Sequence, residues 1–246
     1  MQLSKYNASG NDFVIFHTFK SEDRSQLAVS LCDRFNGVGA DGLIVLVPDS
    51  NSDFKWEFYN SDGSSAAMCG NGSRAAALYA FKNGLCKDEC EFVTTAGVIK
   101  AKIEQNLVEV ALTTPKKLSD EFSELGFDWH FYDTGVPHLV TFVNDLSKFD
   151  LQTSATMRKK YNANVNFAKL ENGILKVRTF ERGVENETNA CGTGMAASFY
   201  AGYKSLKFAP NLKVNPKSGE ELWMRFEDEV IYFKGMVKHC FDTTIY

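Results

Sequence analysis

Two segments of this 246-residue chain place a cysteine before two glycines: Cys69-Gly70-Asn71-Gly72 and Cys191-Gly192-Thr193-Gly194. The glycines permit backbone conformations that other residues resist, and they let a ligand approach the backbone closely. We expect a loop to become a helix at each segment. The first turn of a helix has N–H groups that can bind a carboxylate, and the helix dipole lowers the pKa of a cysteine placed there.

Two such turns facing one ligand would form an anion pocket with a thiol on either side. One cysteine, as a thiolate, would remove a proton from the carbon next to a carboxylate, and the other, as a thiol, would deliver a proton to the opposite face. Backbone amides would stabilise the charge that builds on the carboxylate. Because the two thiols share one proton, their titrations should be coupled. The pattern therefore predicts inversion of a stereocentre without a cofactor.

Three other interpretations fit the same turns. They could be helix starts with buried cysteines and no chemistry, or they could form a non-catalytic module that binds carboxylates. They could also form a redox pair, although reactive redox cysteines usually lie close in sequence and these are 122 residues apart (191 − 69). Recurrence of the turn at matching places in a repeated chain favours the catalytic interpretation.

The repeat extends beyond the turns. The segment 58–76 aligns with 180–198 without a gap, so that Phe58 matches Phe180 and Cys69 matches Cys191. Two flanking pairs recur in the same order, Ser9-Gly10 with Thr134-Gly135 and Ala96-Gly97 with Ser218-Gly219. We therefore expect one half-molecule used twice, joined near Thr114-Pro115-Lys116.

Each half should contain several strands and one central helix. The helices are expected to begin at Gly72-Ser73 and Gly194-Met195 or slightly earlier, and their alanine-rich sequences suit burial on most sides. The predicted fold class is α+β, with two pseudo-symmetric domains. Each is a curved, mostly antiparallel sheet around its helix, and a cleft lies between them.

Local patterns predict further elements. A first helix is expected from Ser21 to Phe35, capped by Ser21 and closed by Gly37. The apolar run Leu43–Val47 and the alternating run Lys55–Tyr59 predict strands, and residues 95–110 predict a hairpin that turns at Gln105-Asn106.

Composition narrows the class of protein. A hydrophobic fraction of 44% and a charged fraction of 24% are typical of globular chains, and a net charge of −4 argues against a nucleic-acid or anionic-membrane surface. No run of about 18 apolar residues is found, and the chain start lacks the pattern of a secretory signal, so the expected compartment is the cytoplasm. No metal site is expected, because no His and no second Cys pair lies near Cys86 and Cys90 in the sequence.

Seven segments in order along nearly the whole chain resemble diaminopimelate epimerase. They are Asn7–Phe13, Phe58–Gly63, Met68–Gly72, Pro137-His138, Asn164–Phe167, Glu181–Gly183 and Ala190–Gly194. The two cysteine turns alone also resemble proline racemases. The Asn after the first Cys-Gly, the Glu-Arg-Gly run and the Asn-Val-Asn-Phe segment favour diaminopimelate epimerase.

The resemblance implies a pyridoxal-independent enzyme that interconverts LL- and meso-diaminopimelate for lysine and peptidoglycan synthesis. It implies a homodimer acting on a small amino-acid substrate, without a cofactor. It also implies that the final strand returns to the first domain. The expected domains are therefore residues 1–115, completed by about 238–246, and residues 116–237.

The resemblance also assigns roles. The catalytic acid/base pair would be Cys69 and Cys191, tuned or oriented by His138 and Glu181. Backbone amides around the substrate carboxylate would come from Gly70, Asn71, Gly192 and Thr193. The polar ends of the substrate would be held by Asn11, Asn60, Asn164 and Arg182, with Glu181 beside them.

Two positions depart from the family pattern. Val136 stands where relatives often have Asn before Pro-His, and Gly42 stands where they often have Gln. Neither change touches the thiols, so both bear on substrate identity rather than on reaction type. A racemase of another amino acid on the same fold, such as histidine, is the alternative that Val136 permits.

Overall fold

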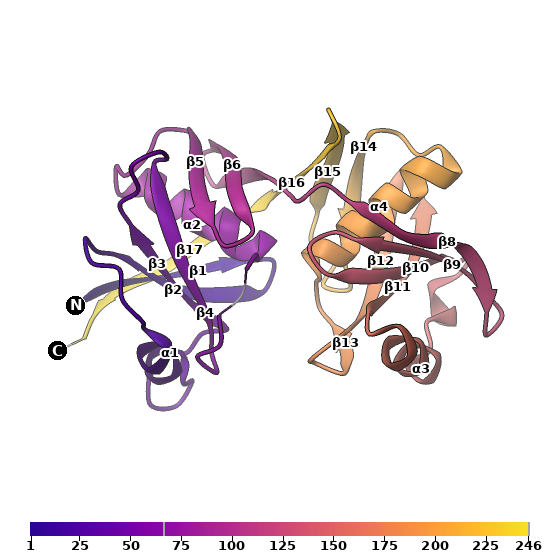
Figure 1. Ribbon diagram of the computed structural model, residues 1–246, viewed down its shortest axis with the longest axis horizontal. Coiled ribbons are helices and arrows are strands. Elements are labelled where there is room, and N and C mark those ends of the chain that lie inside the picture. The colour runs from indigo at the N-terminus through magenta and orange to yellow at the C-terminus, as the bar shows by residue number, and fades with distance from the viewer. Residues whose placement is uncertain (66, 246) are drawn as a thin grey trace. The chain divides into compact units, whose positions relative to one another are not determined.

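The computed structural model describes residues 1–65 and 67–245, and the chain divides into two units. Unit 1 comprises Met1–Ala111 and Gly235–Tyr246, and unit 2 comprises Leu112–Lys234. Each unit has strands around one long helix (Figure 1). The predicted α+β class, with a mostly antiparallel sheet around a central helix in each half, is confirmed. Ala66, inside the aligned repeat, and Tyr246, at the end of the expected last strand, lie outside the described residues.

In unit 1, eight strands pair in the order β17-β1-β2-β3-β4-β5-β6-β7. The pairs β2–β3 and β4–β5 are parallel and the other five are antiparallel. The strands are β1 (Gln2–Ala8), β2 (Asn11–His17), β3 (Gly42–Val47), β4 (Phe54–Asn60), β5 (Glu89–Thr94), β6 (Gly97–Glu104), β7 (Leu107–Ala111) and β17 (Lys238–Thr244). The helices are α1 (Ser25–Cys32) and α2 (Gly70–Lys82).

In unit 2, the pairing order is β8-β9-β10-β11-β12-β14-β15-β16, and β13 pairs with β12. The strands are β8 (Lys116–Glu124), β9 (Phe127–Asp133), β10 (Pro137–Phe142), β11 (Asn164–Glu171), β12 (Ile174–Glu181), β13 (Asn186–Thr188), β14 (Asn211–Asn215), β15 (Leu222–Glu227) and β16 (Val230–Met236). The helices are η1 (Leu146–Lys148), α3 (Leu151–Tyr161) and α4 (Gly192–Leu206).

The two sheets repeat the same succession of strand directions. Counting pairs of neighbouring strands from β17 to β7 in unit 1 and from β8 to β16 in unit 2, the third and fifth pairs are parallel in both sheets. All other pairs are antiparallel. The last strand of the chain, β17, therefore occupies the place in unit 1 that β8 occupies in unit 2. Figure 1 shows both chain ends together in unit 1, where the Met1 amino group donates to the Ile245 carbonyl at 2.6 Å.

The central helices are buried because their sequences are small and apolar. Every residue from Gly70 to Ala80 in α2 is buried, and so is every residue from Gly194 to Gly202 in α4. Alanine combines high helix propensity with a small side chain, so strands can approach such a helix from several directions. Each helix begins two residues before the position named from sequence, because the cysteine itself is the N-cap residue.

The expected first helix is wrong at both ends, because α1 spans only Ser25–Cys32. Ser21 does not cap it; its hydroxyl instead binds the Glu57 carboxylate. Phe35 lies beyond the helix end and is 96% exposed. The chain leaves the helix at Cys32, and the Asp33 carboxylate accepts the Phe35 and Asn36 N–H groups in a turn. Local side-chain contacts therefore end the helix before the apolar spacing does.

The other local predictions are confirmed to within one or two residues. The apolar run became β3, which is buried throughout, and the alternating run became β4. The hairpin consists of β6 and β7, and Gln105 has a φ of 60° at its turn.

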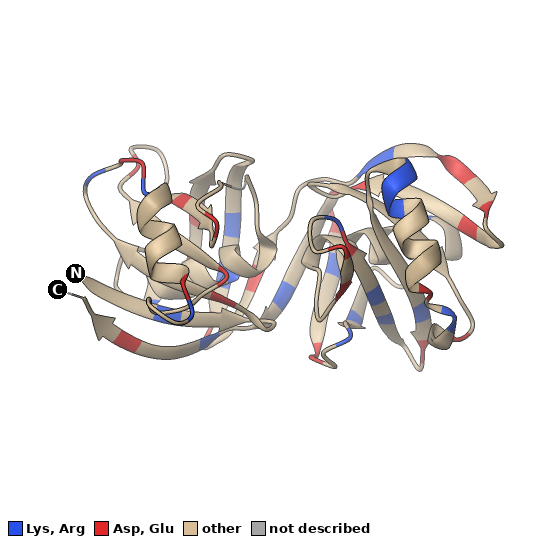
Figure 2. Cartoon of the chain, turned by 90° about the horizontal axis from the view of Figure 1, so that it is seen from below, with Lys and Arg blue, Asp and Glu red and all other residues tan. Residues whose placement is uncertain are grey.

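Acidic and basic residues are interspersed over both units (Figure 2). Within the described part of the chain, no helix combines the length and apolar character needed to cross a bilayer.

Removal of β17 should loosen unit 1 selectively. In a chain that ends at Val237, β1 loses the partner with which it pairs from Gln2 to Asn7. We expect amide exchange in β1 and β2 to accelerate roughly tenfold or more, because the free energy of local opening falls. Hydrogen exchange read by mass spectrometry measures this, and β9 and β10 serve as the internal reference. Unchanged protection of β1 would contradict the assignment of β17 to unit 1.

Candidate active site

Cys69 is the N-cap residue of α2. Its backbone is extended, its carbonyl accepts the Ser73 N–H at 2.8 Å, and its sulfur accepts the Gly72 N–H at 3.3 Å. A side chain that accepts from the third residue of a helix satisfies one of the four N–H groups that lack an intrahelical partner. An N–H donor directed at sulfur also stabilises the thiolate relative to the thiol.

The Arg74 guanidinium holds the first turn of α2 in place through contacts with other residues of unit 1. It is fully buried and donates to the Ser9 hydroxyl and the Asn71 side-chain oxygen, both at 2.7 Å, and to the Met236 backbone carbonyl at 3.2 Å. Arg74 therefore holds the Asn71 side chain by its oxygen. The first-turn amides of Gly70 and Asn71 stay the predicted contacts of a carboxylate.

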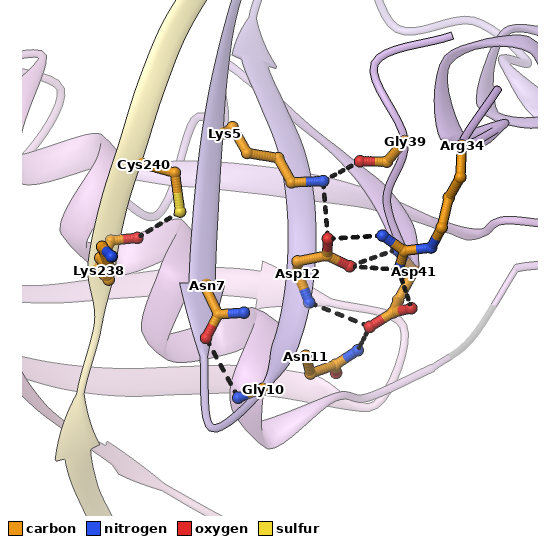
Figure 3. Close-up of polar contacts among 10 residues, drawn as sticks. All are labelled: Lys5, Asn7, Gly10, Asn11, Asp12, Arg34, Gly39, Asp41, Lys238 and Cys240. Atoms are coloured by element: carbon orange, nitrogen blue, oxygen red, sulfur yellow. Dashed lines mark hydrogen bonds and ion pairs between the residues drawn. The ribbon is translucent and has the colours of Figure 1, made fainter. Parts of the chain in front are cut away.

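Asn11 contacts the Cys69 sulfur. The Asn11 amide nitrogen donates to Asp41 Oδ2 at 2.7 Å (Figure 3). The Asn11 amide oxygen accepts from the Cys69 thiol at 3.7 Å. A carbonyl oxygen can only accept, so Asn11 favours the protonated form of Cys69. The Gly72 N–H has the opposite preference, and the sulfur therefore has a partner in either state.

A charged cluster fixes Asp41 and with it Asn11 (Figure 3). Arg34 binds Asp12 through two nitrogens at 2.9 and 3.0 Å and binds Asp41 at 2.7 Å, and Lys5 pairs with Asp12 at 2.8 Å. Burial alone would raise the pKa of Asp12, but the hydrogen bonds from Arg34 and Lys5 outweigh it and hold this pKa well below its usual range. The sequence alone did not identify Arg34, Asp12 or Asp41 as part of the site.

Cys191 is the N-cap residue of α4 in unit 2. Its carbonyl accepts the Met195 N–H at 3.0 Å, and its side chain makes no capping hydrogen bond. Its sulfur instead lies 3.5 Å from the Thr193 hydroxyl oxygen. The turn is held against the loop before β10, because the Thr134 hydroxyl donates to the Thr193 carbonyl at 2.8 Å. The two cysteines therefore share a helical position but have different polar neighbours.

His138 lies behind the Cys191 turn. Its Nε2 is 2.9 Å from the Thr193 hydroxyl, so it reaches the sulfur through that side chain. Burial and the nearby positive charge of Arg182 lower the pKa of His138 from 6.5 to about 3. The imidazole is therefore neutral at physiological pH, and it acts as a hydrogen-bonding group rather than as a cation.

Asn164 and Arg182 are adjacent in unit 2. The Asn164 side-chain oxygen accepts the Arg182 backbone N–H at 2.7 Å, and the Arg182 guanidinium donates to the Asn162 carbonyl at 3.0 Å. Glu181 ends β12 opposite Asn186, and burial raises the pKa of its carboxyl group. The roles of these residues toward a substrate stay predictions.

Asn60 ends β4 in unit 1. Its backbone pairs with Gly42, and its side chain donates to the Ser64 hydroxyl at 3.0 Å. A Cβ atom on Gly42 would lie 2.8 Å from the Tyr59 carbonyl and 3.0 Å from the Phe58 ring. Glycine is therefore required by packing at this position, where the family pattern often has Gln.

Two further residues were missed from sequence. Asn166 and Thr179 are buried side chains of unit 2 that hydrogen-bond to each other at 2.8 Å, and Asn166 also contacts His138. The signal for Asn166 was present in the sequence. Asn164 and Asn166 alternate with the apolar residues Val165 and Phe167, so their side chains lie on one face of the sheet. Among residues 1–65 and 67–245, no group of three or more His, Cys, Asp or Glu side chains gathers as a metal site would.

Comparison with known proteins identifies the family. The family model for diaminopimelate epimerase matches residues 3–118 and 130–240. The chain belongs to the diaminopimelate epimerase family. The diaminopimelate epimerase of a Nitratiruptor species is 58% identical over 99% of this chain and 98% of that protein. That of Helicobacter pylori is 39% identical over 97% and 94%. The resemblance found in the sequence is thereby confirmed.

Solved structures share the fold at low sequence identity. A phenazine biosynthesis protein of the PhzF family from Enterococcus faecalis has a TM-score of 0.77 and 13% identity, over 100% of this chain and 98% of that one. A hydroxyproline epimerase from Agrobacterium vitis has a TM-score of 0.73 and 14% identity, over 99% and 91%. These likenesses show that several proteins use the same fold.

Arg34→Gln tests the charged cluster that anchors Asn11. At pH 7 the variant should be less stable by about 1 kcal/mol, a modest amount because Arg34 is half exposed and solvent screens its charge. The pKa of Asp12 is depressed in the folded state, so its stabilising contribution is fully present above its unfolded pKa of about 3.9 and is lost as pH falls from there through the depressed folded pKa. The stability gap between wild type and variant should therefore narrow from pH 7 to pH 2.

Calorimetric unfolding at both pH values measures this gap. Lys100→Gln is the matched control, since it removes an exposed ion pair with Glu91 in the same unit. The cluster would not have its assigned role if the Arg34 variant behaved like the Lys100 variant at both pH values.

Proposed function

We propose that this chain interconverts LL- and meso-diaminopimelate by proton transfer at one α-carbon, with Cys69 and Cys191 as the acid/base pair. The supporting observation is that a cysteine caps the buried central helix in each of two units that share one strand order. The close relatives named diaminopimelate epimerase support the substrate.

The reaction needs one thiolate and one thiol at the start. The thiolate takes the α-proton and becomes a thiol, while the opposite thiol gives its proton to the other face of the carbon and becomes a thiolate. Two groups are required because a single base returns the proton to the face it came from. Within each unit, the polar contacts described above supply both sulfurs with hydrogen-bond partners.

The α-carboxylate would be bound by first-turn amides of both helices, from Gly70 and Asn71 in α2 and from Gly192 and Thr193 in α4. First-turn amides would stabilise the negative charge that grows as the proton leaves. The distal amine and carboxylate would be held by Asn11, Asn60, Asn164 and Arg182. Arg182 suits the distal carboxylate because a guanidinium can donate two parallel hydrogen bonds. Glu181 would lie near them and assist orientation.

As part of the same proposal, the enzyme acts in the cytoplasm as a homodimer in lysine and peptidoglycan precursor synthesis. Val136 favours one alternative, a racemase of another amino acid such as histidine, because its side chain offers no hydrogen bond to a distal polar group. Turnover of LL-diaminopimelate beside a panel of L-amino acids separates the two, and absence of turnover on diaminopimelate would remove the proposed substrate.

Cys69→Ala and Cys191→Ala should each lower kcat by on the order of a thousandfold, because each removes a group that moves a proton in the transition state. Cys240→Ala is the control, since this exposed thiol is not assigned to the site. In D₂O, the wild type should place deuterium in the product before it appears in the remaining substrate, as two separate bases require.

The single variants sharpen the test. Each retains one base, so each should exchange the α-proton of only one stereoisomer, and Cys69→Ala and Cys191→Ala should act on opposite ones. A variant that inverts the centre at the wild-type rate would disprove the paired-thiol mechanism. Absence of exchange in the wild type would instead indicate a module that only binds.

A further inference from the structure

Asn166 is held rigidly beside the His138 ring in unit 2. It is fully buried on β11, its side-chain oxygen accepts the Thr179 hydroxyl at 2.8 Å, and its amide nitrogen donates to the Leu139 carbonyl at 2.8 Å. These two contacts fix which end of the amide is nitrogen, because a carbonyl oxygen can only accept. The same nitrogen lies 3.1 Å from His138 Nδ1.

This contact determines where the proton of His138 resides. A neutral imidazole carries one N–H, and a nitrogen that receives a hydrogen bond cannot also carry the proton. Because Asn166 donates to Nδ1, the proton lies on Nε2. The Asn164 side chain is also anchored, since its oxygen accepts the Arg182 N–H at 2.7 Å, and its nitrogen lies 3.3 Å from Nε2. That nitrogen is 3.5 Å from its other acceptor, the Pro137 carbonyl, whereas Asn166 makes the shorter contact with the ring, so Asn166 exerts the stronger constraint.

The protonated Nε2 in turn determines how Thr193 is oriented. Nε2 donates to the Thr193 hydroxyl oxygen at 2.9 Å, so the hydroxyl hydrogen is left for another acceptor. The Cys191 sulfur lies 3.5 Å from that oxygen. A hydroxyl that donates to sulfur stabilises the thiolate, and it does so without placing a positive charge in the site.

We propose that Asn166 is a positioning residue that holds His138 in the neutral tautomer protonated at Nε2, so that the Thr193 hydroxyl donates to Cys191 and stabilises its thiolate. Thr193 then has two roles: its backbone amide binds the substrate carboxylate, and its hydroxyl donates to the Cys191 sulfur. The contribution of these hydrogen bonds to catalysis rests on the proposed function. Their stabilisation of the Cys191 thiolate is independent of that function.

The tautomer can be observed directly by ¹⁵N NMR of the imidazole nitrogens. In the wild type, His138 should be protonated at Nε2 and unprotonated at Nδ1, and its ring should not titrate between pH 5 and pH 8. In Asn166→Asp, a carboxylate oxygen replaces the amide donor and accepts from Nδ1, so the proton should move to Nδ1. A wild-type His138 protonated at Nδ1 would overturn the proposal.

Alkylation of Cys191 measures the consequence for the sulfur. Thr193→Val removes the hydroxyl. Asn166→Asp leaves Nε2 unprotonated, so that Nε2 competes with the Cys191 sulfur for the hydrogen of the Thr193 hydroxyl. Both variants should lower the rate of iodoacetamide reaction at Cys191 roughly 10-fold at neutral pH and shift its pH profile upward, since a hydrogen bond to a charged group is lost. Thr193→Ser keeps the hydroxyl and should restore the wild-type profile.

Peptide mapping by mass spectrometry follows each cysteine separately, and Cys69 in unit 1 gives the internal reference. Ser198→Ala is the matched control, because it deletes a buried hydroxyl of α4 that binds the Gly194 carbonyl. It should leave the Cys191 profile unchanged. Folded Asn166→Asp with a wild-type Cys191 profile would overturn the proposal.

Kinetics separate this proposal from the proposed function. If both hold, Thr193→Val and Asn166→Asp lower kcat with little change in KM, because the Thr193 backbone amide is retained. If diaminopimelate is not a substrate but the tautomer and the alkylation profiles respond as described, the substrate assignment fails and the role of Asn166 stands. If the wild type turns over diaminopimelate and Thr193→Val matches it in kcat and in Cys191 alkylation, the role of Asn166 fails instead.

Discussion

The first turns of two buried helices are the constraint on which the site depends. A helix buried along most of its length still presents N–H groups at its start that no residue of the helix can accept. The Cys69 sulfur satisfies one of these groups, that of Gly72, and the remaining first-turn amides suit an anion. The first turn that would offer its Gly70 and Asn71 amides to a carboxylate also directs its Gly72 N–H at the sulfur, so substrate binding and thiol activation would have one structural origin.

The two sulfurs have different environments, which suits a reaction that requires one thiol and one thiolate. Cys69 meets an obligate acceptor, the Asn11 oxygen, as well as the Gly72 donor, and can therefore be stabilised in either state. Cys191 meets a hydroxyl whose own partner is a neutral histidine. Asn11 is oriented by a surface-linked cluster of charges, whereas Thr193 is oriented by buried neutral groups. Salt should therefore affect the Cys69 side more than the Cys191 side, because exposed charges are screened and buried dipoles are not.

Features with local causes could be predicted from the sequence. The glycines and alanines of the two turns predicted the central helices to within two residues, and the repeat predicted a shared architecture for both halves. The start of the first helix was mispredicted because Ser21 binds Glu57, a residue 36 positions away, which no local pattern reveals. Asn166 was missed for the same reason. Its importance depends on the parallel pairing of β10 with β11, which aligns Val140 with Asn166 and brings His138 alongside. The alternating asparagines signalled a polar face, but their partners come from the register of the sheet.

The last glycine of each cysteine turn, Gly72 or Gly194, is present for a different physical reason in each unit. At Gly72 an added Cβ would lie 3.4 Å from its nearest neighbours, which is an ordinary contact. At Gly194 it would lie 2.4 Å from the Asn166 side-chain oxygen and 3.1 Å from the Thr179 hydroxyl, and the 2.4 Å approach is one that neither group could tolerate without moving. The second glycine therefore lets α4 approach the side chain that determines the His138 tautomer. The repeated motif therefore has different packing neighbours in the two units.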